Sequence, residues 1–383
     1  MNPEENITNK QIIEPYLLDP RENYPEPYYM LEYNGVPFSA IGGIQALSGQ
    51  KKNGKTFVLA QLMAAVLATG CDRVNTYLPG LRVPDRTLEH LGHKPKVLYI
   101  DTEMEKLNSA KVLRRVHWLC DWPMGEKVDR FNVLWLRSVT DDKDENGRTT
   151  WKAYQKRWYI IKAAIDELEP DIVFIDGLRD IIGDFNDNTQ SASLVGDLMS
   201  LAEDKHICIW GVLHMNPRPG NDDESKMRGH LGTELGNKVT DTLVSIKSKS
   251  ASGVTFTVKQ MDARGKDMDD WQFEVTDAAG ALGVPRITSA ARTVEENVKA
   301  DSPDAIREWI KISCRFYEWP MSKRDVSKSV FGDIGGQKNH AKQAADMEVA
   351  INSGFLEQST LKKNGAYMWE PNEEIKEEET NPA

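Results

Sequence analysis

Gly49-Gln50-Lys51-Lys52-Asn53-Gly54-Lys55-Thr56 is the stretch of this 383-residue sequence that decides its fold. It fits the pattern Gly-x-x-x-x-Gly-Lys-Ser/Thr, the P-loop. An apolar run at 44–47 precedes the loop and predicts a buried strand, and a longer run at 57–68 follows it and predicts a buried helix. Because a P-loop joins a strand to a helix, the flanking sequence favours the motif over a chance match in a glycine-containing turn.

The residues of this loop are suited to hold the phosphates of a nucleotide. Gly49, Asn53 and Gly54 would let backbone N–H groups turn towards phosphate oxygens, and the start of the following helix adds free N–H groups and a positive dipole end. Lys55 would reach the β- and γ-phosphates, and the Thr56 hydroxyl would ligate Mg²⁺.

Two further apolar runs end in carboxylates, as a nucleotide-hydrolysing site requires. The run at 97–100 leads into Asp101 and Glu103. We expect Glu103 to activate water, with Asp101 as the second choice; the alternative is that both cap the helix expected at 106–120. The run at 171–176 ends in Asp176 and fits the Walker B pattern, in which the carboxylate holds Mg²⁺ through water.

Three more polar residues are candidates for the same site. His214 ends an apolar run at 207–213 and could sense the γ-phosphate, although a lone histidine is more often structural. Arg228 and Arg264 follow in loops near the ends of later elements. Either could stabilise charge on the transferring phosphoryl group from a neighbouring subunit, or could be an ordinary surface charge.

Composition restricts the protein class without deciding its partner. The net charge of −11 looks unfavourable for nucleic-acid binding, but binding depends on local charge distribution, so composition neither supports nor excludes DNA. The four cysteines are far apart and form no Cys-x-x-Cys pair, which favours a reducing cytoplasm over a structural zinc. We expect no membrane span and no signal peptide, because no apolar stretch is long enough and the N-terminus is polar.

Strand-like runs alternate with helical stretches through most of the chain, which predicts an α/β fold with a mainly parallel central sheet. The expected strands are 44–47, 97–100, 133–136, 172–175, 207–212, 243–246, 255–258 and 273–275. The expected segments are a lead-in at 1–40, an ATPase domain at 41–277, a linker at 278–301, a small domain at 302–371 and an acidic tail at 372–383.

The sequence of the small domain predicts three helices followed by two short strands. The turn between those strands, Lys362-Lys363-Asn364-Gly365, is a basic hairpin of the Asn-Gly type. This layout resembles a winged helix, whose third helix would be the 337–352 segment, with Lys338, Asn339, His340, Lys342 and Gln343 near its start. Such a module binds duplex DNA through that helix and the wing, or else a protein partner.

Taken in order, the motifs resemble a known family. The P-loop, the Asp-Thr-Glu strand end, the Ile-Asp-Gly strand end and the strand ending in histidine appear in the sequence of RecA-like ATPases of the RepA type, which are hexameric replicative helicases of plasmids and mobile elements. The resemblance covers roughly residues 35–275. It departs from the family at Leu213-His214-Met215, where many relatives have two histidines, and in the wider spacing of Lys259 and Arg264.

The resemblance implies a RecA-like P-loop NTPase core, ATP and Mg²⁺ as cofactors, a homo-oligomer, expected to be a hexamer, and single-stranded DNA in its channel. It assigns the catalytic glutamate to Glu103, the Walker B aspartate to Asp176 and the motif histidine to His214, with Arg228 and Arg264 in the region that supplies arginines in trans. We expect a cytoplasmic DNA helicase for replication of a plasmid or mobile element, with a primase or initiator protein as a further partner. The alternatives are an ATP-dependent DNA-binding or recombination accessory protein without unwinding, and a small-molecule kinase.

Overall fold

A computed structural model describes residues 9–215, 226–250, 253–290, 301–336, 340–363 and 366–380. The chain divides into two compact units, Met1–Ala291 and Arg292–Ala383, which are described separately. Within the described residues, no helix is both long and apolar enough to cross a membrane.

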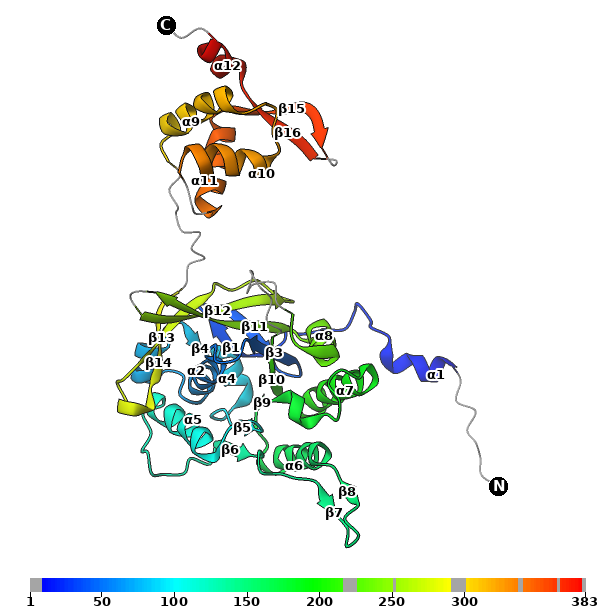
Figure 1. The fold of residues 1–383 in the computed structure, drawn as a ribbon. Helices are drawn as coiled ribbons and strands as arrows, with labels where there is room; N and C mark the ends of the chain where they lie inside the picture. The colour runs from blue at the N-terminus through cyan, green and yellow to red at the C-terminus, as the bar shows by residue number, and fades with distance from the viewer. Residues whose placement is uncertain are drawn as a thin grey trace. The chain divides into compact units, whose positions relative to one another are not determined.

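The first unit is built around a nine-stranded sheet in the order β14-β13-β12-β11-β3-β10-β9-β5-β6 (Figure 1). Its strands are β3 (Ile44–Gly49), β5 (Val97–Asp101), β6 (Phe131–Trp135), β9 (Ile172–Asp176), β10 (Cys208–His214), β11 (Asp241–Ser250), β12 (Gly253–Ala263), β13 (Trp271–Thr276) and β14 (Val284–Ala290). The six strands from β11 to β6 run parallel to one another, whereas β12, β13 and β14 pair antiparallel, β12 with β11. The prediction of an α/β fold with a mainly parallel sheet is confirmed.

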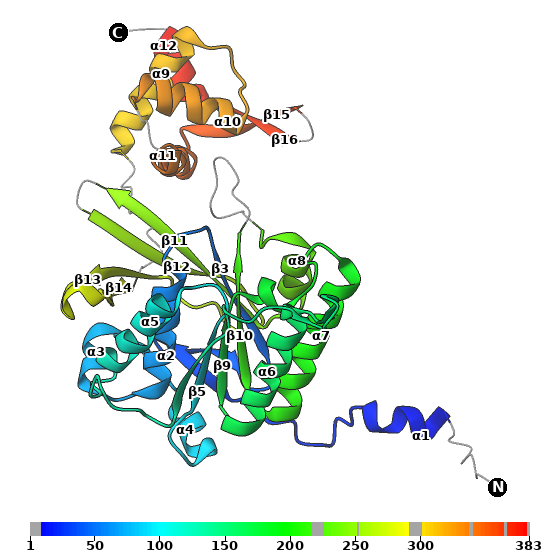
Figure 2. The ribbon, with the colours of Figure 1, turned by 60° about the horizontal axis from the view of Figure 1, so that its bottom comes forward.

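Helices cover both faces of the parallel strands (Figures 1 and 2). On one face lie α2 (Lys55–Leu67) and α5 (Lys106–Leu119); on the other lie α6 (Ala153–Leu168), α7 (Asn188–Lys205) and α8 (Gly229–Lys238). Neighbouring strand residues face opposite layers, so Leu47 packs with α2 whereas Ala46 packs with the α7 side. This explains why the strands read as continuous apolar runs. Because the six strands from β11 to β6 are parallel, their C-terminal ends lie at one edge of the sheet.

Part of the expected lead-in at 1–40 is ordered structure. β1 (Tyr29–Tyr33) and β2 (Val36–Ala40) form a small antiparallel sheet with β4 (Leu81–Arg82). Met30, Leu31 and Phe38 are fully buried against the α2 layer, so these short strands complete the core on that side. The remaining short elements are α1 (Asn9–Ile13), η1 (Glu14–Tyr16), α3 (Asp72–Tyr77), α4 (Asp85–Leu91), β7 (Asp142–Lys143), β8 (Thr149–Trp151) and η2 (Leu178–Ile181).

The first part of the linker expected at 278–301 is regular structure. Residues Gly280–Leu282 form the 3-10 turn η4, and β14 then pairs along β13 at the edge of the sheet. Val284 and Ile287 are buried in the α2 layer, although the surrounding Ala-, Gly- and Thr-rich composition shows little periodicity. Residues 291–300 lie outside the described part of the chain.

The second unit has its own hydrophobic core and contains three helices, a further helical turn, a hairpin and a closing helix. These are α9 (Pro303–Phe316), α10 (Lys323–Val326), the π-helical η5 (Ser327–Ile334), α11 (His340–Asn352), β15 (Leu356–Lys363), β16 (Ala366–Pro371) and α12 (Glu373–Thr380). The expected acidic tail is mostly helical: Ile375 of α12 is fully buried, and Glu374 lies 3.2 Å from Arg307 of α9. The buried Ile375 anchors this segment, although its acidic composition predicted an unstructured tail.

Candidate nucleotide-binding site

The loop between β3 and α2 has the backbone shape that its glycines allow. Gly54 has φ +86°, and a Cβ there would lie 2.5 Å from the Phe256 ring. A Cβ on Gly49 would lie 2.6 Å from the carbonyl oxygen of Ser245 on β11. Both positions therefore exclude a side chain by contact with the strands beside the loop, in addition to the left-handed backbone at Gly54.

Lys55, His214 and Glu103 form a continuous polar chain from the loop to the end of β5. The Lys55 Nζ donates to the carbonyl oxygens of Gly49 (3.0 Å) and Gln50 (2.9 Å), and lies 3.1 Å from His214 Nδ1. The Nε2 of the same imidazole lies 3.5 Å from a carboxylate oxygen of Glu103. Three residues from three separate elements thus converge at the carboxyl edge of the sheet.

The partners of the two ring nitrogens favour one tautomer of a neutral His214. Lysine ammonium is only a donor, so Nδ1 must accept, which leaves the single proton of a neutral imidazole on Nε2, facing Glu103. The interaction with His214 lowers the pKa of Glu103, with burial opposing it. Burial lowers the pKa of Lys55, while the charges of Asp176 and Glu103 act in the opposite direction.

Asp176 ends β9 and is only 7% exposed. The Tyr99 hydroxyl donates to its Oδ2 at 3.1 Å. Burial, together with the negative charges of Glu103 and Asp101, raises the pKa of Asp176 to about 7. A buried carboxylate that is this costly to ionise is typical of a functional site, since a bound cation would relieve the cost.

Asp101 has a positioning role that differs from the second-choice base predicted for it. Its Oδ1 accepts from the backbone N–H groups of Glu103 and Met104, both at 2.9 Å, and its Oδ2 accepts from the Ser109 hydroxyl. With both oxygens engaged and the side chain fully buried, Asp101 fixes the turn that presents Glu103. Glu103 itself stays partly exposed, with its side chain 38% accessible.

A cavity of about 320 Å³ contains most of the predicted nucleotide residues. Asn53, Gly54, Lys55, Thr56, Glu103, Asp176 and His214 line it. Four residues that sequence reasoning missed also line it: Phe57, Met104, Lys247 and Phe256. Phe57 and Phe256 lie 6.2 Å apart, and the Lys247 ammonium lies 5.5 Å from the Phe256 ring centroid, so an aromatic and cationic wall faces the loop. The pairing of β11 and β12 beside β3 brings Lys247 and Phe256 here.

The donor set suits Mg²⁺ held jointly with a nucleotide. Among the described residues, no cluster of three or more His, Cys, Asp or Glu side chains could hold a metal alone. Thr56 and Asp176 line one cavity and supply oxygen ligands; phosphate oxygens and water would complete the octahedron that Mg²⁺ prefers.

The two predicted arginines lie at different ends of the sheet. The Arg228 N–H donates to the His214 carbonyl oxygen at 3.0 Å, and its side chain shares a small cavity with Glu103 and His214 of the same subunit. The backbone N–H of Arg264 donates to the Thr240 carbonyl oxygen, and the N–H of Thr240 donates to the carbonyl oxygen of Ile44 at the start of β3. Since β3 rises about 3.3 Å per residue, Arg264 is roughly 17 Å from its own loop along the strand.

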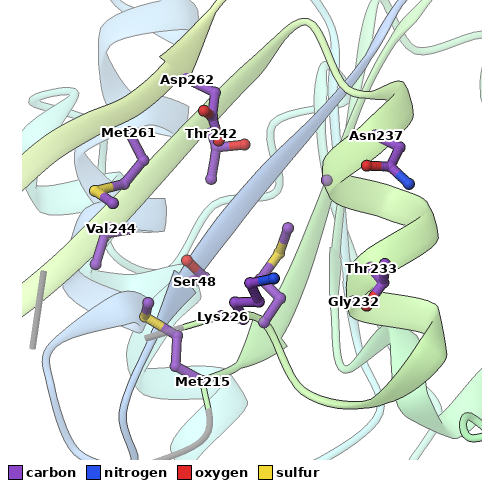
Figure 3. Close-up of a pocket in the computed structure, with 12 residues that line it drawn as sticks. Ser48, Met215, Lys226, Gly232, Thr233, Asn237, Thr242, Val244, Met261 and Asp262 are labelled. Carbon is purple, nitrogen blue, oxygen red and sulfur yellow. The ribbon is translucent and has the colours of Figure 1, made fainter. Parts of the chain in front are cut away.

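A second cavity, of about 340 Å³, lies beside the loop and was not predicted (Figure 3). Met215, Val244 and Met261 line one side, Thr233 and Asn237 of α8 line the other, and Ser48 lies between them. The hydroxyl of Thr242, also in its lining, is buried without a hydrogen-bond partner among the described residues.

Comparison with known proteins supports the nucleotide site. A family model described as an AAA domain matches residues 36–218, the range that holds the P-loop, Glu103, Asp176 and His214. Among curated proteins, none matches the chain. The match supports a P-loop ATPase, with the nucleotide binding that such a domain implies.

Proposed function

We propose that this chain hydrolyses ATP at the carboxyl edge of its sheet, with Glu103 as the residue that polarises the attacking water. The observation that carries the proposal is the chain of contacts from Lys55 through His214 to Glu103. It joins the lysine that holds phosphates to the carboxylate that acts on water, so occupancy of the loop and orientation of the base are physically linked.

Each residue then has a separate task. The Lys55 ammonium, now bound to two loop carbonyls, transfers to phosphate oxygens. His214, released from Lys55, keeps its Nε2 proton towards Glu103 and holds that side chain in place. Asp176 and Thr56 would hold Mg²⁺, which neutralises charge on the phosphates when bound. Phe57 and Phe256 give the cavity an apolar lining beside the loop.

The second level of the proposal is a ring-shaped motor, hexameric by resemblance, that acts as a helicase on single-stranded DNA. The position of Arg264 supports an assembly, because it lies too far from its own P-loop to contact a nucleotide there. An exposed arginine at that end of β12 is suited to reach a neighbour's nucleotide and stabilise its transferring phosphoryl group.

The second unit supports contact with DNA through its hairpin. Its order of helices followed by a two-stranded hairpin supports the proposal of a winged helix. The Lys362 ammonium lies 4.0 Å from the Tyr367 ring centroid at the hairpin end. A lysine next to an exposed aromatic ring suits a nucleic-acid backbone. The expected recognition helix is less favourable: Lys342 pairs with Asp301 at 2.8 Å and Gln343 is buried, while Lys338 and Asn339 lie outside the described residues.

The ion pairs within the second unit favour the alternative function. With Lys342, Arg307 and Lys376 all paired to acids of their own unit, the second unit could bind a protein such as a primase or initiator. ATP would then control assembly on DNA without unwinding.

Two assays separate these levels. Hydrolysis of ATP by the wild type, abolished in Lys55→Ala with the fold intact, tests the ATPase; unchanged turnover in that variant would overturn it. Release of a strand from a forked duplex tests the helicase. Hydrolysis without strand release, with ATP-dependent retention of DNA, would support the accessory protein.

A further inference from the structure

Two arginines that the proposed mechanism does not use lie over one phenyl ring. The Arg179 guanidinium carbon is 4.5 Å from the Phe185 ring centroid, and that of Arg228 is 5.6 Å from the same centroid. Arg179 comes from η2, which follows Asp176 on β9, whereas Arg228 immediately precedes α8. Segments separated by some fifty positions in the sequence thus direct two cations to one place.

The backbone holds this arrangement in place. The Phe185 carbonyl oxygen accepts the Leu231 N–H of α8 at 3.0 Å, and a Cβ on Gly229 would lie 2.5 Å from the Phe185 ring. Gly229 has φ +75°, so the turn before α8 needs a glycine for two reasons. Phe185 is therefore locked against the start of α8, and the arginines share a firm support.

Neither guanidinium forms an ion pair with an acid among the described residues, although the charges of Glu103 and Asp180 act on Arg179 at longer range. The nearest acids are engaged elsewhere: Glu103 contacts His214 at 3.5 Å, and Asp180 accepts from Thr102 at 3.0 Å. Both arginine residues are exposed. Bringing two cations together costs electrostatic energy, and contact with one half-buried ring offsets only about 0.5–1 kcal/mol for each of them. An anion between them would remove that repulsion.

The surroundings favour phosphate in particular. Guanidinium groups bind phosphate oxygens in bidentate fashion, and the N-terminus of the ten-residue helix α8 adds positive potential at Arg228. The small cavity that both arginines share with Glu103 and His214 holds about 20 Å³, room for one water at most. An anion would therefore bind outside this cavity, where both arginine residues are exposed.

We propose that Arg179 and Arg228 form a second phosphate-binding site beside Phe185, outside the small cavity that they share with Glu103 and His214. Its ligand is either orthophosphate leaving the nucleotide site or a phosphodiester of bound nucleic acid, which present the same oxygens. The choice between these sources rests on the proposed function, whereas phosphate binding itself does not.

Binding is measured in the Lys55→Ala background, which disables the P-loop, so the outcome is independent of hydrolysis. The probes are orthophosphate and a single-stranded oligonucleotide, at constant ionic strength. Arg179→Gln and Arg228→Gln should each weaken binding about tenfold or more, the usual effect of losing one hydrogen bond to a charged group. Arg137→Gln is the matched control, an exposed arginine 3.8 Å from Glu105.

The pattern of losses identifies the source. If the arginine variants lose affinity for orthophosphate alone, the ligand is the leaving product. If they lose affinity for the oligonucleotide, the ligand is a phosphodiester. The affinity for an abasic oligonucleotide should then fall by the same factor, because the bases are not contacted. Equal affinities in Arg179→Gln, Arg228→Gln and Arg137→Gln, with unchanged melting temperatures, would overturn the site while leaving the ATPase proposal untouched. If the wild type does not hydrolyse ATP but phosphate binding still depends on the two arginines, the ATPase proposal is overturned and the phosphate site stands.

Discussion

Replacing Asp176 with asparagine should stabilise the metal-free protein. The side chain is 7% exposed, and its pKa is raised from 3.8 to about 7, chiefly by burial. Asparagine keeps an oxygen that can accept from the Tyr99 hydroxyl, but carries no charge. The substitution therefore removes the cost of ionising a buried acid while retaining its shape.

The magnitude follows from linkage between pKa and stability. Because the pKa of Asp176 is higher in the folded than in the unfolded protein, its contribution to the free energy of unfolding is fully present below pH 3.8. That contribution is lost as the pH rises towards about 7. At about 1.36 kcal/mol per pH unit, the raised pKa of Asp176 costs the wild type roughly 2 kcal/mol at pH 5.5, where the folded protein must keep the carboxyl protonated, and roughly 4 kcal/mol at pH 8, where it must bury the ionised form. Asp176→Asn should gain these amounts relative to the wild type.

Urea unfolding followed by circular dichroism in the presence of a chelator tests this, with Asp166→Asn as the control. Asp166 is 60% exposed and pairs with Lys205 at 2.6 Å, so its removal should cost at most about 1 kcal/mol. With saturating Mg²⁺-nucleotide the order should invert, because only the wild type gains from metal binding. If Asp176→Asn is no more stable than the wild type at pH 8 without metal, the reasoning about a costly buried carboxylate is wrong.

Four more substitutions or conditions test other parts of the site. Glu103→Gln should lower hydrolysis by about 10²–10⁴-fold while nucleotide affinity, measured by fluorescence titration, changes little; an equal loss of affinity would assign Glu103 to binding instead. Mg²⁺-dependent nucleotide binding should weaken as the pH falls below about 7, because Asp176 protonates there; flat affinity from pH 8 to 5.5, by calorimetry, would contradict the metal role. Gly54→Ala should destabilise the protein by about 1–2 kcal/mol from backbone strain alone, and remove nucleotide binding through contact with Phe256; a normal melting temperature and affinity would refute that packing argument. Thr242→Val should raise stability by up to about 1 kcal/mol, because its hydroxyl is buried without a described partner, whereas Thr242→Ser should not; a loss in the valine variant would indicate a hidden partner.

The sequence was most informative where local pattern and chemistry coincide. A glycine loop between two apolar runs predicts strand, loop and helix together, and the carboxyl ends of parallel strands meet at one edge, so Lys55, Glu103, Asp176 and His214 could be placed near each other before any coordinates. Strands buried on both faces gave strong signals for the same reason.

The rest depends on contacts distant in the sequence. Phe256 and Lys247 reach the site because β11 and β12 pair beside β3, which no local pattern reveals. β14 was missed because its alternation is weak and its burial comes from the α2 layer. Asp101 looked like a second base until its hydrogen bonds to Glu103, Met104 and Ser109 showed a positioning role.

The most direct test of the central claim is the rate of ATP hydrolysis with and without single-stranded DNA, for the wild type and Glu103→Gln side by side. The account predicts hydrolysis that DNA stimulates in the wild type and that is almost lost in the variant under both conditions. Equal turnover in the two proteins would contradict Glu103 as the base and the site as it is described. Hydrolysis that depends on Glu103 but ignores DNA would keep the ATPase and reject the DNA motor.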